Sequence, residues 1–169
     1  RQGTGSQVIA PFGYNNLTNT GNGARTLSST GTIRIAGTWS RGTGTYTLGT
    51  STVEFNGTGA QTIGNGNYYN LTVSNTRGSN NITWTPGTYT ILNDLAANAT
   101  FTSGNHIMSG TTIDFAKSTG TANIPGLPYV NITNSGNGNR NLTGNISISG
   151  TFTRGSAGVY STCLLYTSD

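Results

Sequence analysis

The feature that most constrains the fold of this chain is a segment that occurs three times. Its clearest copy spans residues 57–63 (GTGAQTI) and continues at residues 68–73 (YYNLTV). A copy with the same spacing spans residues 3–18, and a looser copy spans residues 119–133. The anchor tyrosines of the copies lie 54 and 61 residues apart, at Tyr14, Tyr68 and Tyr129. An internal period of this size predicts a repeat architecture.

Short strands are predicted within each repeat. Residues 32–35 (TIRI), 52–55 (TVEF) and 112–115 (TIDF) alternate apolar and polar side chains at period two. A unit of 54 to 61 residues is too long for one solenoid coil, so each unit is expected to make two or three coils. We therefore predict an all-β right-handed parallel β-helix over residues 1–162, with a β-sandwich as the alternative. Stacked coils would place the three anchor tyrosines along one line.

The middle repeat departs most from the other two. Residues 93–98 form an extra segment, within which residues 94–97 (DLAA) could make one helical turn. No other stretch has helical periodicity. The first and third repeats align closely, and residues 37–42 match residues 150–155. One aromatic residue stands between small hydroxyl residues at the same place in each repeat, namely Trp39, Phe101 and Phe152.

The charge of the chain is low and dispersed. Charged residues make up 7% of the sequence, and the net charge is +4. The eight basic residues are scattered along the chain, at Arg1, Arg25, Arg34, Arg41, Arg77, Lys117, Arg140 and Arg154. Nucleic-acid binding needs a clustered basic face, so no nucleic-acid partner is expected. No apolar run is long enough to span a membrane, and the single cysteine, Cys163, cannot form an internal disulfide.

Glu54 and Asp114 are the only acidic residues at matching positions of two repeats. Carboxylates about 5 to 9.5 Å apart could cleave a glycosidic bond. Two or three coils at about 4.8 Å per coil instead predict a separation of roughly 10–14 Å. We therefore interpret both residues as outward and solvated, expect no catalytic residue, and predict that the module is not an enzyme.

His106 is the only histidine, and it takes the place of Tyr46 in the repeat. This indicates a packing or surface position, because the sequence suggests no partner that would orient the ring as a general base. One histidine, one cysteine and four acidic residues do not suggest a metal site either. We expect neither a metal ion nor a cofactor.

Two polar motifs recur. Asn-X-Ser/Thr sequences would be glycosylation sites in some secreted proteins, but a repeated Asn–apolar–Thr strand motif creates them automatically, at Asn16, Asn70, Asn81, Asn98, Asn131, Asn141 and Asn145. Thr-X-Thr pairs occur at residues 45/47, 83/85, 88/90, 100/102 and 151/153. Ranked threonines on a flat face are typical of ice-binding solenoids. The irregular spacing here favours ordinary strand propensity.

Residues 52–63 (TVEFNGTGAQTI) followed by residues 69–73 (YNLTV) resemble the β-strand repeats of very large secreted bacterial surface proteins, including adhesins and autotransporter-like passenger regions. The resemblance covers about residues 3–161. It implies export, an extracellular or cell-surface location, and a structural or adhesive role as a stalk or a multivalent, weakly binding surface. The partners it implies are neighbouring repeats of the same chain, with a glycan or a host or cell surface as further candidates.

Two other functions stay open at this point. A polysaccharide-active or glycan-binding β-helix would be favoured by outward aromatic residues in a groove, whereas inward aromatic side chains would favour the stalk. The aromatic residues in question are Trp39, Trp84, Phe101 and Phe152. An ice-binding solenoid would be favoured by a flat face of ranked threonines.

The C-terminal end breaks the repeat. The third copy follows the first as far as residues 159–161, but residues 163–169 (CLLYTSD) resemble a translated sequencing adapter. We expect them to be a non-native tail that adds nothing to stability, with a natural capping strand as the alternative. Because the sequence starts at Arg1 without an initiator methionine, we also expect it to be an internal piece of a longer protein.

Overall fold

The computed structural model describes residues 6–156 and 158–161, which form a right-handed parallel β-helix. This part of the chain contains strands and turns but no helix. Its strands are β1 (Gln7–Ile9), β2 (Gly13–Tyr14), β3 (Leu17–Thr18), β4 (Arg25–Leu27), β5 (Thr32–Ile35), β6 (Trp39–Ser40), β7 (Tyr46–Thr47), β8 (Thr52–Phe55), β9 (Gln61–Ile63), β10 (Gly66–Val73), β11 (Ile82–Trp84), β12 (Gly87–Ala97), β13 (His106–Ile107), β14 (Thr111–Phe115), β15 (Thr121–Ile124), β16 (Pro128–Tyr129), β17 (Asn131–Thr133), β18 (Asn139–Leu142), β19 (Ser147–Ile148), β20 (Phe152–Thr153) and β21 (Tyr160–Ser161).

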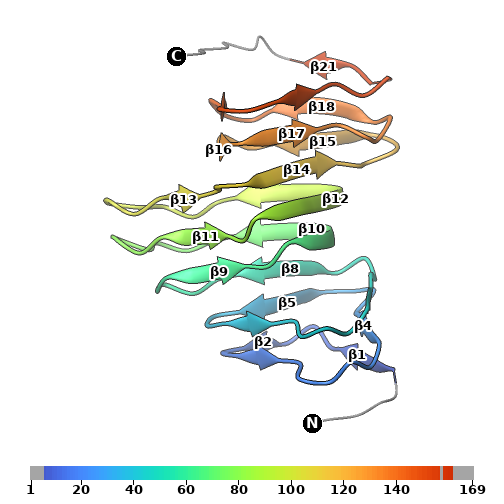
Figure 1. The fold of residues 1–169 in the computed structure, drawn as a ribbon, viewed down its shortest axis with the longest axis vertical. Helices are drawn as coiled ribbons and strands as arrows, with labels where there is room; N and C mark the ends of the chain where they lie inside the picture. The colour runs from blue at the N-terminus through green and yellow to red at the C-terminus, as the bar shows by residue number, and fades with distance from the viewer. Residues whose placement is uncertain (1–5, 157, 162–169) are drawn as a thin grey trace.

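Each strand pairs in parallel with a strand of a neighbouring coil. The largest sheet holds eight strands, in the order β2-β5-β8-β10-β12-β14-β17-β20. The coils stack from β1 to β21 along the long axis of the molecule (Figure 1). The predicted β-helix is therefore confirmed, and the β-sandwich alternative is wrong. Residues 163–169 lie outside the described residues, so the interpretation of the tail stays a prediction.

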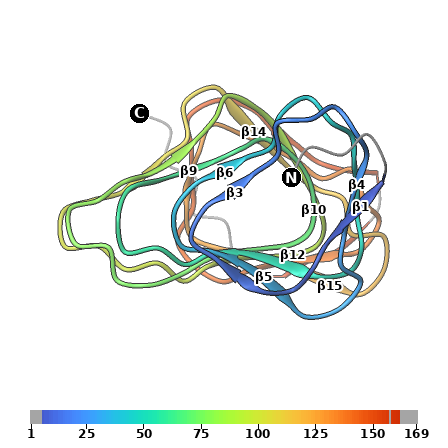
Figure 2. The ribbon, with the colours of Figure 1, turned by 90° about the horizontal axis from the view of Figure 1, so that it is seen from below.

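The coil has three sides. β10 bends between two of them, because its register with β12 shifts between Tyr68 and Asn70, and each half of β10 pairs with a different half of β12. When β10 and β12 are counted as two segments each, every strand pairing in the described chain joins segments three apart in chain order. Paired residues are 18 to 24 positions apart, as for Phe55 with Val73 and Val73 with Ala97. Seen along the axis, the coils surround a common interior, and the green to yellow coils extend beyond the others on one side (Figure 2).

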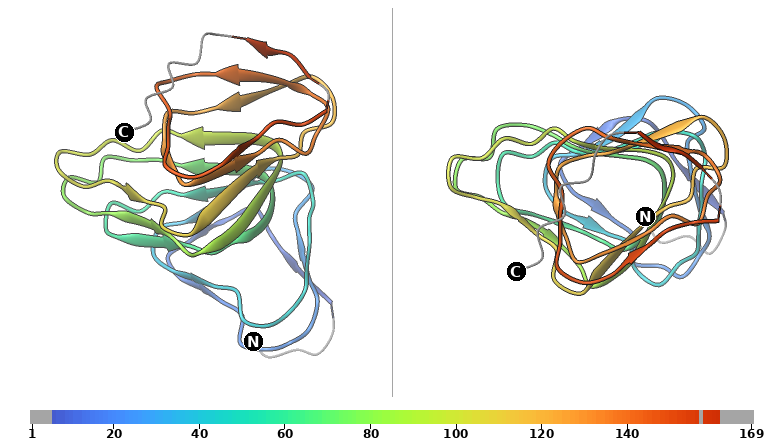
Figure 3. Two further views of the ribbon diagram at one scale, coloured as in Figure 1. Left: turned by 45° about the horizontal axis from the view of Figure 1, so that its top comes forward. Right: turned by 90° about the horizontal axis from the view of Figure 1, so that it is seen from above.

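The middle coils are larger than the others. Their loops, coloured green to yellow, extend to one side of the stack (Figure 3). Neighbouring loops are joined by polar contacts, such as the bond that Thr100 Oγ1 donates to Thr76 Oγ1 at 3.1 Å. The extra residues of the middle repeat also lengthen β12, which runs to Ala97. The helical turn expected at residues 94–97 is therefore wrong, since Leu95 pairs with Leu71 in the ladder and its side chain is buried.

The sequence repeat and the coil have different periods. From Tyr14 to Tyr68, and again from Tyr68 to Tyr129, the chain advances by eight strand segments, which is two and two-thirds coils. Eight is not a multiple of three, so each copy of the repeat is displaced by one face from the copy before. Tyr14 pairs with Ile35, Tyr68 with Ile91 and Tyr129 with Ile148. The expectation that the three tyrosines share one line is therefore wrong.

What the anchor tyrosines do share is a local bond. The hydroxyl group of each donates to the main-chain carbonyl four residues earlier: Tyr14 to Ala10 at 3.1 Å, Tyr68 to Gly64 at 2.6 Å and Tyr129 to Pro125 at 2.8 Å. Tyr89 makes the same bond to Thr85. The motif thus fixes a corner between two strands, and a corner of the same shape serves on any face of the helix.

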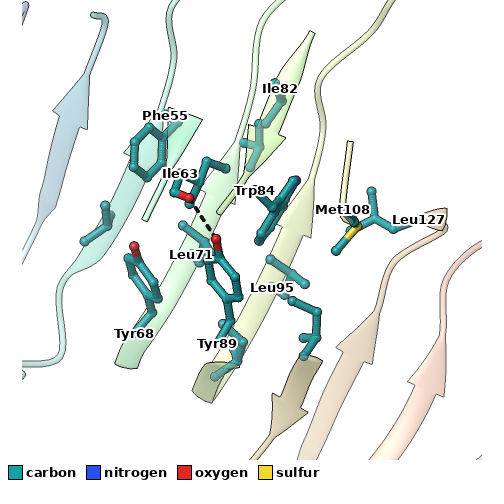
Figure 4. Packing of buried hydrophobic residues seen from close by; sticks show 14 of the residues in the cluster. Phe55, Ile63, Tyr68, Leu71, Ile82, Trp84, Tyr89, Leu95, Met108 and Leu127 are labelled. Atoms are coloured by element: carbon teal, nitrogen blue, oxygen red, sulfur yellow. Dashed lines mark hydrogen bonds between the residues drawn. The ribbon is translucent and has the colours of Figure 1, made fainter. Parts of the chain in front are cut away.

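The interior is a continuous apolar core (Figure 4). Inward positions are aligned by the ladder, as in the column formed by Ile33, Val53, Leu71 and Leu95, all of which are buried. Burying one such side chain contributes about 1.5–3 kcal/mol. Trp39 and Trp84 also point inward, while Phe101 and Phe152 are half-buried against the core. The aromatic residues are thus largely used in packing.

Candidate binding groove at a repeat junction

The hydrogen-bonded ladder opens at the same place in two successive repeats. Within the described chain, β7 does not pair with the first half of β10, and β6 does not pair with β9. The two members of each of these pairs are three segments apart in chain order, the separation at which the other strands pair. Eight segments further on, β12 does not pair with β15, and β13 does not pair with β16. Both openings come just before an anchor tyrosine. The two ladder openings are therefore a property of the junction between repeats.

A groove of about 400 Å³ lies at the first opening. One wall comes from β6, β7 and the turn between them, with Trp39, Arg41 and Tyr46. The other wall is the turn before Tyr68, which contributes Asn65 and Asn67. Glycines complete the lining, at Gly42, Gly44, Gly64 and Gly66. Main-chain groups and amide side chains therefore make up much of its surface.

Arg41 lies at the centre of this groove. Its guanidinium carbon is 5.0 Å from the ring centroid of Trp39, 4.3 Å from that of Tyr46 and 5.5 Å from that of Tyr68, so it makes cation–π contacts. Arg41 Nη1 donates to the main-chain oxygen of Asn65 at 3.0 Å and so bridges the opening. Among the described residues the only ion pair is Arg34 with Glu54, so Arg41 has no carboxylate partner there.

Trp39 forms the aromatic base of the groove. Its ring meets that of Tyr46 edge to face at 5.8 Å, and Tyr46 Oη donates to the main-chain oxygen of Arg41 at 2.7 Å. The indole Nε1 of Trp39 is buried and has no hydrogen-bond partner in the described structure. A buried donor of this kind ordinarily finds a partner. The wall of the groove therefore contains one buried, unsatisfied donor near the guanidinium of Arg41.

The third repeat contains a related arrangement. Phe152 and Tyr160 meet edge to face at 6.0 Å, and the guanidinium of Arg154 lies 4.8 Å from the Tyr160 ring centroid. Asn134 donates to Tyr160 Oη, as Asn19 donates to Tyr46 Oη. In the middle repeat the equivalent pair is Phe101 with His106, and Ser103 stands where the other repeats have arginine.

A second groove, of about 340 Å³, lies at the second ladder opening. It is lined by the second half of β12, with Asp94, and by Asn123 of β15 and the turn at Pro125 and Gly126. Its charged residue is acidic where that of the first groove is basic. Both grooves thus lie at ladder openings, but their charged residues have opposite sign.

Glu54 and Asp114 do not form a carboxylate pair. Glu54 Oε2 accepts from Arg34 Nε at 3.0 Å, and Glu54 Oε1 accepts from Ser74 Oγ at 2.8 Å. Asp114 accepts from the main-chain nitrogen and the hydroxyl of Ser135. The two residues also face different sides, since Glu54 is opposite Thr72 and Asp114 is opposite Thr90. Both carboxylates therefore bridge neighbouring coils rather than converge on one another.

His106 is a core residue. Its side chain is buried, and its Nδ1 accepts a hydrogen bond of 3.1 Å from Trp84 Nε1. Burial, together with a smaller contribution from the positive charge of Arg77, lowers the pKa of His106 from 6.5 to about 4. The neutral imidazole is thus the form that the fold requires, because only an unprotonated Nδ1 can accept from the indole.

Most of the asparagines in Asn-X-Ser/Thr sequences tie one coil to another. Asn16 Oδ1 accepts from the main-chain nitrogen and hydroxyl of Thr38, and Asn131 Oδ1 accepts the same two bonds from Thr151. Gly37 precedes Thr38 because a Cβ at that position would lie 2.3 Å from Asn16 Oδ1. Three further members of the set bond across coils, namely Asn70, Asn81 and Asn141. These contacts support the interpretation as a strand motif.

The Thr-X-Thr pairs are distributed over several sheets. Residues 45/47 lie at β7, residues 83/85 at β11 and residues 100/102 in a loop. Only residues 88/90 and 151/153 lie on the eight-stranded sheet, where Thr133 pairs with Thr153. Threonines are thus aligned only in short ranks, which Asp114 interrupts opposite Thr90.

Three buried arginines were not anticipated from the sequence, where they counted only as scattered charge. Arg25, Arg77 and Arg140 are at most 2% exposed, and main-chain carbonyl and side-chain amide oxygens accept their hydrogen bonds. Arg25 and Arg140 bond Asn19 and Asn134 through Nε in the same way. Burial lowers the pKa of Arg77 and Arg140. The motif Asn-X-Gly-Asn-Gly-X-Arg, which occurs at residues 19–25 and 134–140, is the sequence feature that could have indicated two of them.

Comparison with known proteins gives no relative: no family model, no curated protein and no solved structure matches the chain. The described residues contain no group of three or more metal-ligating side chains and no helix of the length and apolarity needed to cross a membrane. The junction groove and its Arg41 are therefore the main candidate site.

We expect stability to depend on pH through His106. The pKa of His106 is lower in the folded than in the unfolded chain. The contribution of the neutral imidazole to the free energy of unfolding is therefore complete above about pH 6.5 and is lost as the pH falls toward about 4. The loss is on the order of 3 kcal/mol. Urea titrations of the native protein and His106→Gln between pH 4 and 7 measure this. A similar decline in both proteins would contradict the assignment to His106.

Proposed function

We propose that this protein is a structural repeat module, a stalk segment of a secreted or cell-surface bacterial protein with a weakly adhesive polar surface. The observation that carries the proposal is that the acidic and imidazole side chains make structural contacts. Glu54, Asp114 and His106 each bond neighbouring coils or the core rather than face one another. A surface of Thr, Asn, Ser and Gly can make many weak hydrogen bonds, and tandem copies raise the effective concentration of such contacts.

The repeat geometry supports a role as a spacer. Each unit carries its own corner bond and inter-coil asparagine contacts, and it adds eight strand segments without closing the stack. Solenoids of this kind extend by adding units, because each coil contacts only its neighbours. Length is therefore a property that the sequence can adjust by copy number.

Ice binding is a second candidate. The observation in its favour is the rank in which Thr88 pairs with Thr112, next to the pair of Thr133 with Thr153. Asp114 lies between these pairs and bonds Ser135, which breaks the regularity that an ice-matching face needs. We therefore place this function behind the stalk.

Insertion of one repeat tests the spacer role. A second copy of residues 14–67, placed between Asn67 and Tyr68, should lengthen the particle by about 13 Å, two and two-thirds coils of about 4.8 Å. Small-angle scattering gives the length, and calorimetry should show one cooperative transition. A control insertion of residues 14–60 omits β9 and should be less stable. Two independent transitions, or no gain in length, would contradict a continuous stalk.

We also expect no polysaccharide hydrolase or lyase activity. The carboxylates that such chemistry needs are bonded on different sides of the helix, as described for Glu54 and Asp114. Incubation of the purified protein with a panel of neutral and acidic polysaccharides, followed by reducing-end analysis, measures this. Turnover that disappears in Glu54→Gln or Asp114→Asn would restore the enzyme hypothesis.

A further inference from the structure

The groove at the first junction contains an arginine that has no carboxylate partner among the described residues, a feature that Arg154 of the third repeat shares. Arg34 pairs with Glu54, and Arg25, Arg77 and Arg140 are buried among oxygen acceptors. Arg41 donates through Nη1 to the main-chain oxygen of Asn65 and also hydrogen-bonds the Tyr68 side chain, while three aromatic rings hold its guanidinium in place. A planar guanidinium presents five donors and matches a carboxylate in geometry. The remaining donors of Arg41 are therefore positioned for an anionic group.

The walls of the groove select a polar ligand. Asn65 and Asn67 are exposed. Asn65 Nδ2 already donates to the main-chain oxygen of Pro86 at 2.7 Å, so Asn65 offers its Oδ1 as an acceptor, whereas an amide such as that of Asn67 can both donate to and accept from hydroxyl groups. Gly66 has a φ of 127°, which strains residues other than glycine, and a Cβ there would also lie 2.8 Å from Arg41 Nη1. Large exposed apolar residues of the described chain lie elsewhere, at Val8, Phe12, Leu92, Ile107 and Val159.

These features favour a sugar acid over a peptide. Peptide recognition generally relies on apolar pockets for side chains. Apart from the buried Trp39 and the half-buried Tyr46, this groove presents arginine, asparagine and glycine. A uronic acid carries one carboxylate beside several hydroxyls, which suits one guanidinium flanked by two amides. We propose that the groove binds a uronate residue of an acidic polysaccharide, with the carboxylate on Arg41 and the sugar hydroxyls on Asn65 and Asn67.

The repeat geometry adds a spacing to this proposal. Arg154 lies over Tyr160 in the third repeat at the position that Arg41 occupies in the first. The two positions are two repeats apart, or five and one-third coils, so they face different sides and differ in height by about 26 Å. A single straight polymer chain would therefore reach one of them at a time, and binding by one molecule should be weak.

Titration calorimetry with polygalacturonate at low ionic strength tests the proposal. Arg41→Gln should bind about tenfold or more weakly than the native protein, because one charge-assisted contact is lost. Arg34→Gln removes the same charge from a surface ion pair and should bind like the native protein. Fully methyl-esterified polygalacturonate lacks carboxylates and should bind neither the native protein nor Arg34→Gln. The proposal would be overturned if the native protein bound the methyl ester or polyglutamate as tightly as polygalacturonate. It would also be overturned if both variants lost affinity for polygalacturonate to the same extent.

A second measurement does not depend on how well the variant folds. Addition of galacturonate oligomers to the native protein should shift the Arg41 Nε–H resonance in a ¹⁵N spectrum and leave that of Arg140 unchanged, since Arg140 is buried. No shift of the Arg41 signal at saturating oligomer would contradict the site. The proposal names a partner for the adhesive surface proposed above and rests on it. A protein that lengthens on repeat insertion but does not bind would lose this proposal alone.

Discussion

Parallel main-chain hydrogen bonding between coils is the interaction on which the rest of this structure depends. It fixes which side chains stand above one another, so the apolar column of Ile33, Val53, Leu71 and Leu95 follows from the ladder register. Side chains extend the same connections outside the strands, as when Asn16 accepts two bonds from Thr38 one coil above. Few acidic or catalytic residues are needed for such a fold.

The junctions between repeats are where this ladder is incomplete, and side chains compensate there. At the first junction, Gln61 Nε2 donates to the main-chain oxygens of Ile35 and Gly37. Arg41 crosses the same opening to Asn65. An opening in a regular ladder thus concentrates polar groups, which connects the architecture to the proposed uronate site.

Strand positions and fold class could be predicted from the sequence because alternation and the internal repeat are local signals. The face of the helix on which each repeat starts could not be predicted. It depends on the count of eight strand segments per repeat and three per coil, and that count requires knowing that β10 and β12 each bend between two sides. The groove was also beyond sequence reasoning: Arg41 counted only as charge, and its three aromatic neighbours, Trp39, Tyr46 and Tyr68, come from different strands. The buried arginines share this limitation.

The relation between repeat and coil is the central claim, and nuclear Overhauser contacts of the anchor tyrosines test it most directly. The account predicts contacts across the ladder from Tyr14 to Ile35, from Tyr68 to Ile91 and from Tyr129 to Ile148. Equivalent copies would then stand on three different faces. A set of contacts that places the three tyrosines in a single column, with a whole number of coils between them, would contradict it.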